Sequence, residues 1–328
     1  MFTLKKYIIT FSLILIYTIN IYSQEKINTI VNTVKERILV SGYAQAGYDY
    51  STEGEGENEF LLRRATLTVI GKITPQWTTC FQYSFTQKGD ILNCYTEYSF
   101  MPELTVRMGQ YLTPFTLDNQ ISPAAIELIR TQSTGTKYYT GCDRSDFAYG
   151  AQGGRDIGIM VLGSLFKNKL DYAFSVQNGQ GINTKDKNKQ KDIAGKLDFH
   201  ILDSWIVTRY NDIKMDEDYR RNRWSVGSAL EFKKVNARVE YMEGKDKNTR
   251  SQGMYGLVCC EILPKLELIG SVDFLNRNKE TKDKQVMYIG GIQYWFYPKC
   301  RLAAQYTYQK EKLRGNAQVL QAQIQVSF

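Results

Sequence analysis

The chain alternates apolar and polar residues with a period of two from Ile38 to Phe328, and its C-terminal end shows the pattern most clearly. One phase of that end holds Leu320, Ala322, Ile324, Val326 and Phe328. The other phase holds Gln321, Gln323, Gln325 and Ser327. Because successive side chains of a strand point to opposite faces, this period predicts strands with one apolar and one polar face.

About sixteen such segments follow one another, each near the ~9–11 residues that a tilted strand needs to cross a bilayer. They span residues 38–50, 60–72, 76–87, 91–100, 104–113, 155–165, 169–178, 191–201, 204–211, 222–232, 235–244, 253–262, 265–276, 285–297, 300–312 and 316–328. The repetition predicts an all-β chain that forms a transmembrane antiparallel β-barrel of about sixteen strands.

The connections between these segments support a barrel. Every second one is a tight turn, at Thr74–Pro75, Met101–Glu103, Leu202–Asp203, Pro264 and Pro298–Lys299. The intervening ones are mostly longer and polar, as at Ser51 to Glu59, Gly179 to Gln190 and Asp212 to Arg221. Short periplasmic turns that alternate with longer external loops are typical of bacterial outer-membrane barrels. An even number of strands places both chain ends on the periplasmic side.

Aromatic residues gather in the apolar phase, where a barrel would meet lipid. The stripes are Trp77, Phe81, Tyr83 and Phe85; Leu170, Tyr172, Phe174 and Val176; and Trp224, Val226, Leu230 and Phe232. Aromatic residues at strand ends form girdles at the two membrane boundaries of such barrels. The alternative is that these stripes form the core of a soluble β-sandwich.

The N-terminal residues are typical of an export signal. Lys5 and Lys6 precede an apolar stretch from Tyr7 to about Ile19, so residues 1–23 are predicted to be a cleaved signal peptide. A membrane anchor is the alternative. Residues 24–37 are expected to form a short periplasmic segment, either an amphipathic helix or a disordered lead-in, and residues 38–328 to form the barrel.

Composition narrows the range of functions. The formal net charge of +8 is spread along the chain without a basic block, so we expect no nucleic-acid partner. The six cysteines show no disulfide framework and no metal-ligand spacing, and most of them are expected to be free thiols. No cofactor or metal site is expected.

One connection, between Pro114 and Gly154, is far longer than the others. A loop of this size without strands is usually functional, and we expect it to fold into the lumen and narrow it. The alternative is a solvated cap outside the barrel. The predicted pore-lining and constriction residues are Arg64, Arg107, Asp118, Glu127, Arg130, Lys137, Arg144 and Arg155.

Several short motifs resemble the phosphate-selective porin O and P family. They are Phe60-Leu61-Leu62-Arg63-Arg64-Ala65-Thr66-Leu67, Arg107-Met108-Gly109-Gln110-Tyr111-Leu112-Thr113-Pro114-Phe115, Arg155-Asp156-Ile157-Gly158 and Asn178-Gly179. The resemblance covers most of the mature chain in layout. It implies a 16-stranded outer-membrane barrel, often trimeric, that passes small anions by diffusion.

The charges assigned to the lumen are mixed. The polar phase holds the cations Arg64, Arg107, Lys196, Arg223, Arg238 and Arg301. It also holds the acids Asp49, Glu97, Asp156, Asp171, Asp192, Asp198, Glu231, Glu240, Glu267 and Asp273. Rings of arginine and lysine favour anions, so a pore with this mixture is expected to be weakly selective. Any preference for anions would depend on where Arg64, Arg107 and Arg130 lie. Arg63 falls in the other phase and is expected near the outer rim, in contact with lipopolysaccharide phosphates or with the neighbouring loop; the alternative is an ordinary solvated arginine.

Two other classes of protein remain as alternatives. An outer-membrane hydrolase would need a nucleophile with a base, but the only histidine, His200, is placed at the periplasmic end, so no catalytic residues are expected. A structural or adhesive barrel would use polar loops such as Lys185 to Lys191 and Lys279 to Lys284. The sequence therefore predicts an outer-membrane porin whose partners are membrane lipid, lipopolysaccharide and small hydrophilic solutes.

Overall fold

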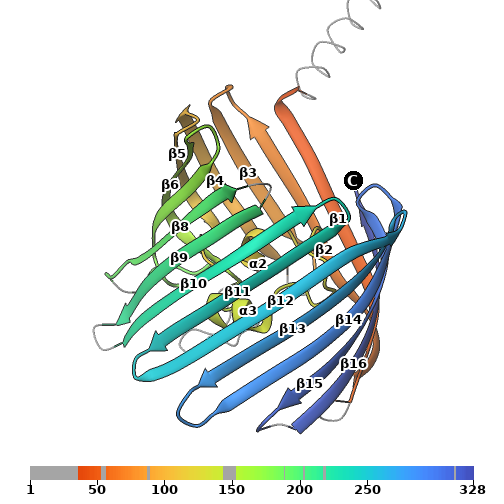
Figure 1. Ribbon diagram of the computed structural model, residues 1–328. Helices are drawn as coiled ribbons and strands as arrows, with labels where there is room; N and C mark the ends of the chain where they lie inside the picture. The colour runs from red at the N-terminus through yellow and green to blue at the C-terminus, as the bar shows by residue number, and fades with distance from the viewer. Residues whose placement is uncertain are drawn as a thin grey trace, which may run out of the picture.

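The chain folds as a closed antiparallel β-barrel (Figure 1). The computed structural model describes residues 36–52, 57–86, 89–142, 153–187, 189–201, 204–216, 219–313 and 315–328. These described residues form sixteen strands: β1 (Ile38–Ser51), β2 (Glu57–Lys72), β3 (Trp77–Ser84), β4 (Asp90–Met101), β5 (Leu104–Leu112), β6 (Arg155–Leu165), β7 (Leu170–Gln177), β8 (Asp192–Ile201), β9 (Ser204–Asp216), β10 (Tyr219–Phe232), β11 (Val235–Asp246), β12 (Thr249–Leu263), β13 (Leu266–Asn278), β14 (Asp283–Tyr297), β15 (Cys300–Glu311) and β16 (Gly315–Ser327).

Each strand pairs with its sequence neighbours, and β1 closes the ring by pairing with β16. At the seam, the N–H of Gly42 donates to the carbonyl oxygen of Phe328 at 3.1 Å, and the N–H of Phe328 donates back to Gly42 at 3.0 Å. Closure leaves no open sheet edge, so the alternative of a soluble β-sandwich is excluded. The predicted all-β barrel is confirmed, with strand ends close to those expected.

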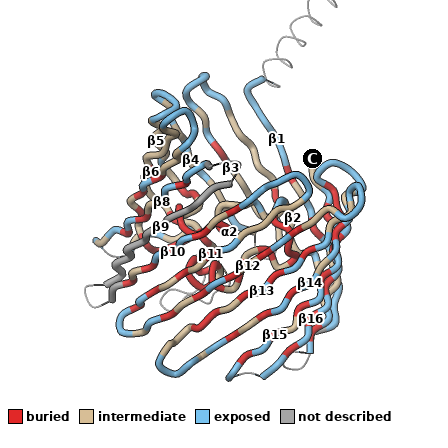
Figure 2. Tube along the Cα trace, in the orientation of Figure 1, coloured by how far each residue is buried: buried red, intermediate tan, exposed pale blue. Residues whose placement is uncertain are grey.

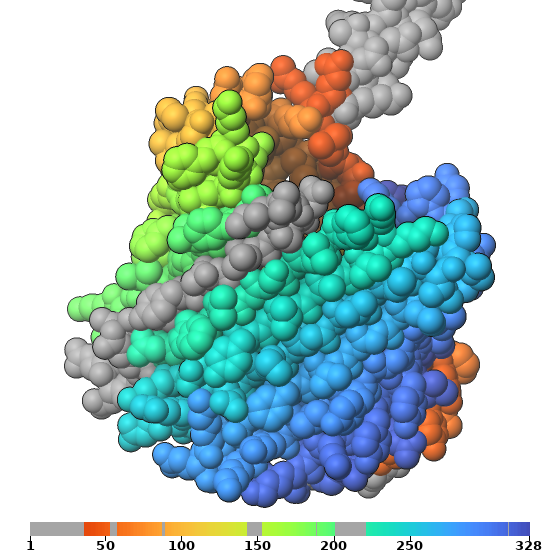
Figure 3. Space-filling model, viewed as in Figure 1, coloured from red at the N-terminus to blue at the C-terminus, as the bar shows by residue number. Residues whose placement is uncertain are grey.

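Alternation along the strands separates an outer from an inner face. In β16 the glutamines at 321, 323 and 325 are buried inside, while Leu320, Ile324 and Val326 are exposed outside. Figure 2 shows the same change between buried and exposed residues along β12–β16. On the face of the barrel that Figure 3 shows, the strands run obliquely side by side. Trp77, Phe81 and Phe174 lie exposed on this outer face, as predicted.

The prediction for Arg63 was wrong. The pairing of β1 with β2 shifts between Gln45 and Ala46, because Gln45 faces Arg64 whereas Ala46 faces Leu62. A β-bulge of this kind inserts one residue and breaks the period of two. Arg63 and Arg64 therefore both point inward, and Arg63 binds Asp49 on the inner wall at 2.6 Å instead of lying at the rim.

The prediction of a long polar loop from Asp212 to Arg221 was also wrong. Strand β9 continues to Asp216 and β10 begins at Tyr219, so only two residues connect them. The polar residues continue the two paired strands beyond the apolar part of the wall. Longer loops are instead found in the first half of the chain, around 52–56, 113–154 and 178–191.

The long connection after β5 folds inward, as expected. It carries the short helices α2 (Leu117–Gln120) and α3 (Thr134–Thr140), and both lie within the ring of strands (Figure 1). Among the described residues, no helix is long and apolar enough to cross a bilayer. The predicted signal peptide and nearly all of the segment 24–37 lie outside the described residues.

Candidate functional site: the inward loop and the facing wall

Glutamine side chains of the inner wall hold the main chain of the first half of the loop. Gln45 on β1 donates to the carbonyl oxygen of Pro123 at 3.3 Å, and Gln325 on β16 donates to that of Ala124 at 3.0 Å. On β15, the side-chain oxygen of Gln305 accepts the N–H of Ile129 at 2.9 Å. Amide side chains suit this position because they both donate and accept. The sequence pattern does not identify these glutamines, since any polar residue fits an inward-facing position.

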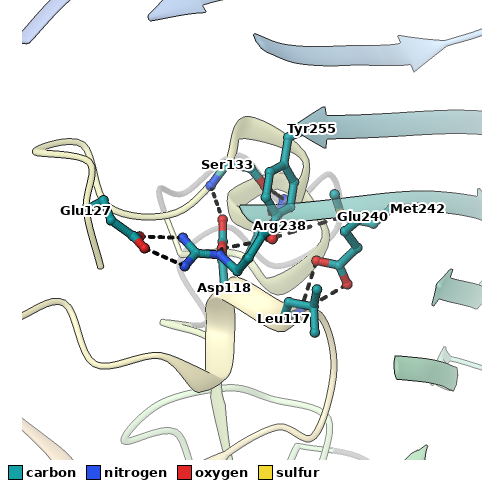
Figure 4. Close-up of polar contacts among 9 residues, drawn as sticks. Leu117, Asp118, Glu127, Ser133, Arg238, Glu240, Met242 and Tyr255 are labelled. Atoms are coloured by element: carbon teal, nitrogen blue, oxygen red, sulfur yellow. Dashed lines mark hydrogen bonds and ion pairs between the residues drawn. The ribbon is translucent and has the colours of Figure 1, made fainter. Parts of the chain in front are cut away.

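A buried ion-pair cluster, which we call the latch, fixes the loop to β11 and β12 (Figure 4). Arg238 on β11 binds both oxygens of Glu127, at 2.9 and 2.7 Å, and its Nε lies 3.4 Å from Asp118. Asp118 also accepts the N–H of Ser133 at 2.9 Å and the hydroxyl of Tyr255 at 2.9 Å. Because Arg238 is bidentate, the contact is directional as well as attractive.

Further wall carboxylates bind N–H groups of the loop. Glu240 accepts the N–H of Leu117, at 3.0 and 2.9 Å (Figure 4). Asp273 on β13 accepts both the N–H and the hydroxyl of Thr134, at 2.5 and 2.8 Å. These bonds satisfy donors at the starts of the two short helices, which have no partner within the helix. The acids assigned to the lumen at 240 and 273 thus hold the loop in place.

Burial changes the ionisation of Asp118 in the latch. Loss of water raises the pKa of Asp118 above its ordinary value, and Arg238, the N–H of Ser133 and the hydroxyl of Tyr255 oppose this effect only in part. The two predicted acids of the loop are therefore buried against the wall, with Asp118 only 2% and Glu127 only 7% exposed. Neither carboxylate is presented to open water in the lumen.

An apolar cluster on the inner wall packs under the loop. Phe115, Leu128, Tyr138 and Tyr139 of the loop meet wall residues of β11–β14. The wall members are Met242, Tyr255, Leu257, Cys259, Ile269, Leu275, Met287 and Ile289. Burial of apolar surface stabilises the loop in this position. The inward-facing positions of these strands are thus apolar where the loop covers them. The alternation of apolar and polar residues predicted polar side chains there.

The predicted cations differ in their surroundings. Arg107 is neutralised by Glu97 at 2.7 Å and lies over the ring of Tyr95. Arg64 instead donates to Gln45 at 3.1 Å and to the hydroxyl of Thr131 at 3.4 Å. These partners are uncharged, so within the described residues no carboxylate compensates the charge of Arg64 where the loop meets the wall of β1 and β2.

Arg155 lies at the exit of the loop, at the start of β6. It donates to the side-chain oxygen of Asn93 at 3.0 Å and to the carbonyl oxygen of Gly153 at 2.9 Å. Within the described part of the chain, neither Arg155 nor Arg64 makes an ion pair with a carboxylate. Both arginines lie close enough to Cys142 and Tyr43 to interact with them electrostatically. The structure therefore brings two uncompensated cations to one region of the lumen.

The other predicted site residues lie in the loop. Arg130 is half-buried, with Nη1 3.8 Å from the sulfur of Met287. Lys137 lies half-buried on α3. Arg144 lies outside the described residues. His200, at its expected position by a short turn, lies 2.8 Å from Asp171.

Sequence analysis missed two arginines that hold the loop. Arg301, assigned to the lumen without a role, donates to the carbonyl oxygen of Ile126 at 2.7 Å, and Arg223 donates to that of Tyr139 at 2.6 Å. Their partners are distant in sequence, so only the closed fold brings them together. All six cysteines are free thiols, as expected. The described residues contain no cluster of side chains suited to a metal ion.

Comparison with solved structures agrees with this architecture. The fold is similar to an anion-selective porin from Comamonas acidovorans, with a TM-score of 0.70 and 12% identity over 89% of this chain and 99% of that porin. It is also similar to OmpF of Salmonella typhi, with a TM-score of 0.69 and 11% identity over 89% and 97% of the two chains.

A trimer form of OmpT, an outer membrane protein of Vibrio cholerae, matches with a TM-score of 0.61 and 10% identity over 88% of this chain and all of that one. No protein-family model and no curated protein sequence matches the chain. At such low identity these likenesses show the fold alone: the chain has the barrel architecture of outer-membrane porins. Membership of the phosphate-selective porin O and P family is not supported by a match.

Proposed function

We propose that this protein is an outer-membrane porin that passes small hydrophilic solutes by diffusion and prefers anions. The proposal rests on a difference between the acids and the cations in the lumen. Asp118 and Glu127, the acids in the described part of the inward loop, are bound to the wall of β11 and β12, whereas Arg64 and Arg155 have only uncharged partners among the described residues. A solute passing the loop would therefore meet uncompensated positive charge, which favours anions.

The outer face supports the membrane location. Large apolar side chains are exposed all around the barrel, including Trp224, Leu230, Val272, Ile292 and Leu302. A soluble protein rarely exposes so large an apolar surface, whereas a lipid bilayer would cover it. The titles of the similar structures name porins and outer-membrane proteins, one of them anion-selective and one in a trimer form. We accordingly place the protein in the outer membrane, as a homotrimer in contact with lipid and lipopolysaccharide.

The test is the reversal potential of the refolded protein in planar bilayers under a potassium chloride gradient. The wild type should conduct and favour chloride. An uncompensated charge at ~4 Å contributes about 1 kcal/mol even in water, so Arg64→Gln or Arg155→Gln should lower the chloride-to-potassium permeability ratio by about fivefold. Arg277→Gln is the matched control, because Arg277 is already paired with Glu311 at 2.9 Å.

Two outcomes would contradict the proposal. A strong preference for potassium in the wild type would remove the anion preference while leaving a porin. Correctly folded protein without any conductance would remove the pore and favour a structural or adhesive barrel instead.

A further inference from the structure

The inner wall has a second buried apolar patch, beside the root of the inward loop. Tyr111, Met160 and Ala173 form it on β5, β6 and β7, and Tyr95 and Leu162 pack against them. The interior of an outer-membrane barrel is normally polar and wet. The first apolar patch is explained because Phe115, Leu128, Tyr138 and Tyr139 of the loop pack on it. The second patch is also buried, but an open cavity remains between its residues and Pro114 and Gln120 of the loop.

This patch forms the floor of a cavity of about 250 Å³, which we call the side pocket. Its lining comes from β4–β8 and the loop: Asn93, Tyr95, Arg107, Tyr111, Leu112, Pro114, Gln120, Met160, Leu162, Ala173 and Lys196. Pockets for drug-sized ligands are usually ~300–1,000 Å³, so only a small molecule fits here. A protein segment or a lipid would be too large.

The charged residues that line the side pocket are both cations. Arg107 contacts Glu97 through Nε and Nη2, at 2.8 and 2.7 Å, and these contacts leave its Nη1 without a hydrogen-bond partner among the described residues. Lys196 lies on the other side and is paired with Asp198 at 2.6 Å. Neither Glu97 nor Asp198 lines the pocket. The pocket wall therefore presents N–H donors around an apolar floor.

A third cation lies next to the side pocket. Arg155 donates to Asn93, which lines the pocket, at 3.0 Å, and no described carboxylate pairs with Arg155. A ligand that combines an apolar body with one negative charge matches this arrangement. Its body would cover Met160 and Leu162, and its charged group would accept hydrogen bonds at the edge. An inorganic anion would leave the apolar side of the cavity unfilled, and a neutral apolar molecule would not use the cations.

From this geometry we propose that the side pocket is a binding site for small carboxylates with an apolar or aromatic body. Such a site would slow these anions in the lumen and select them over smaller ones. The inference deepens the proposed porin function and rests on it, because the ligand must enter through the pore.

Current block in planar bilayers tests the proposal, with sodium benzoate and sodium acetate as probes. Covering the small apolar surface of this cavity, at ~25 cal/mol per Å², is worth about 0.9 kcal/mol, or roughly fivefold in affinity. Benzoate should therefore reduce the current at a concentration about five times lower than acetate. Leu162→Asn should remove most of this difference, and Leu112→Asn provides a second variant if the first does not fold. Val319→Asn is the matched control, since Val319 is a buried inward residue of β16 outside the pocket.

The outcomes are distinct. Equal block by benzoate and acetate in the wild type, or an unchanged ratio in both pocket variants, would overturn the proposal. Block by benzyl alcohol as strong as that by benzoate would also overturn it, because the cations would then have no part. Calorimetric titration of benzoate into the refolded protein in detergent repeats the comparison without requiring conductance. Loss of conductance with retained benzoate binding would therefore count against the porin, and normal chloride-selective conductance without benzoate binding would count against the side pocket alone.

Discussion

The latch makes a direct prediction about the inward loop. Replacing Arg238 by methionine keeps most of the side-chain length but removes the only cation that binds both Asp118 and Glu127 in the described structure. The two carboxylates would then remain buried without their positive partner. Removing one member of a buried ion pair typically costs about 3–5 kcal/mol. Since 1.4 kcal/mol is a factor of ten, the undocked fraction of the loop should rise by about a hundredfold or more.

The barrel itself should survive this change. The strand pairing of β11 with β10 and β12 uses main-chain groups, and the side chain of Arg238 contributes nothing to it. Single-channel recording is therefore the suitable assay. Arg238→Met should show a larger mean conductance and more open-channel noise than the wild type, because the loop leaves the lumen for part of the time.

The matched control is Arg277→Met, which removes another half-buried arginine of the inner wall. Arg277 pairs with Asp283 and Glu311 on neighbouring strands. This variant should keep the conductance and noise of the wild type. Unchanged recordings for Arg238→Met, or equal changes in both variants, would refute the role of the latch.

Three further changes test other parts of the structure. Burial raises the pKa of Asp118, so the docked loop binds a proton at a pH where the undocked loop does not. Docking should therefore strengthen as the pH falls towards about 4. Channel noise should then fall in the wild type but not in Asp118→Asn. In Gly47→Ala the new Cβ would lie 2.5 Å from the carbonyl oxygen of Ala322 on β16 and 2.9 Å from Nη2 of Arg63, so the variant should unfold at a lower temperature in detergent, and an unchanged melting curve would contradict the close pairing of β1 with β16. Ile324→Lys on the outer face should destabilise the barrel in lipid by about 2–4 kcal/mol, measured by denaturant titration in vesicles, and an unchanged midpoint would contradict the outward position of Ile324.

Much of the fold could be predicted because period-two patterning is a local property. The glutamines and aliphatic residues of the last strand identify its two faces without knowledge of any other strand. The same reasoning failed at Arg63, because a bulge depends on how two strands pair, and one inserted residue reverses the faces. It also failed between Asp212 and Arg221, because polar residues occur both in loops and in paired strands that extend past the membrane.

The site was less predictable than the fold. The charged loop residues Asp118 and Glu127 lie within the barrel but are buried against the wall, and their partner Arg238 is more than a hundred positions away. Which cation remains uncompensated depends on such distant pairs. Arg107, with an acid opposite on the adjacent strand, is neutralised, while Arg155 faces Asn93. A charge count along the inner phase cannot distinguish these two cases.

The glutamine contacts to the loop determine how the position of the loop responds to salt concentration. Bonds from Gln45, Gln305 and Gln325 join uncharged groups, so dissolved ions do not weaken them as they weaken exposed ion pairs. The segment from Pro123 to Ile129 is thus anchored by contacts that should hold at both low and high salt concentration. The width of the aperture should stay constant across salinities, while the electrical preference for one sign of ion fades as salt rises.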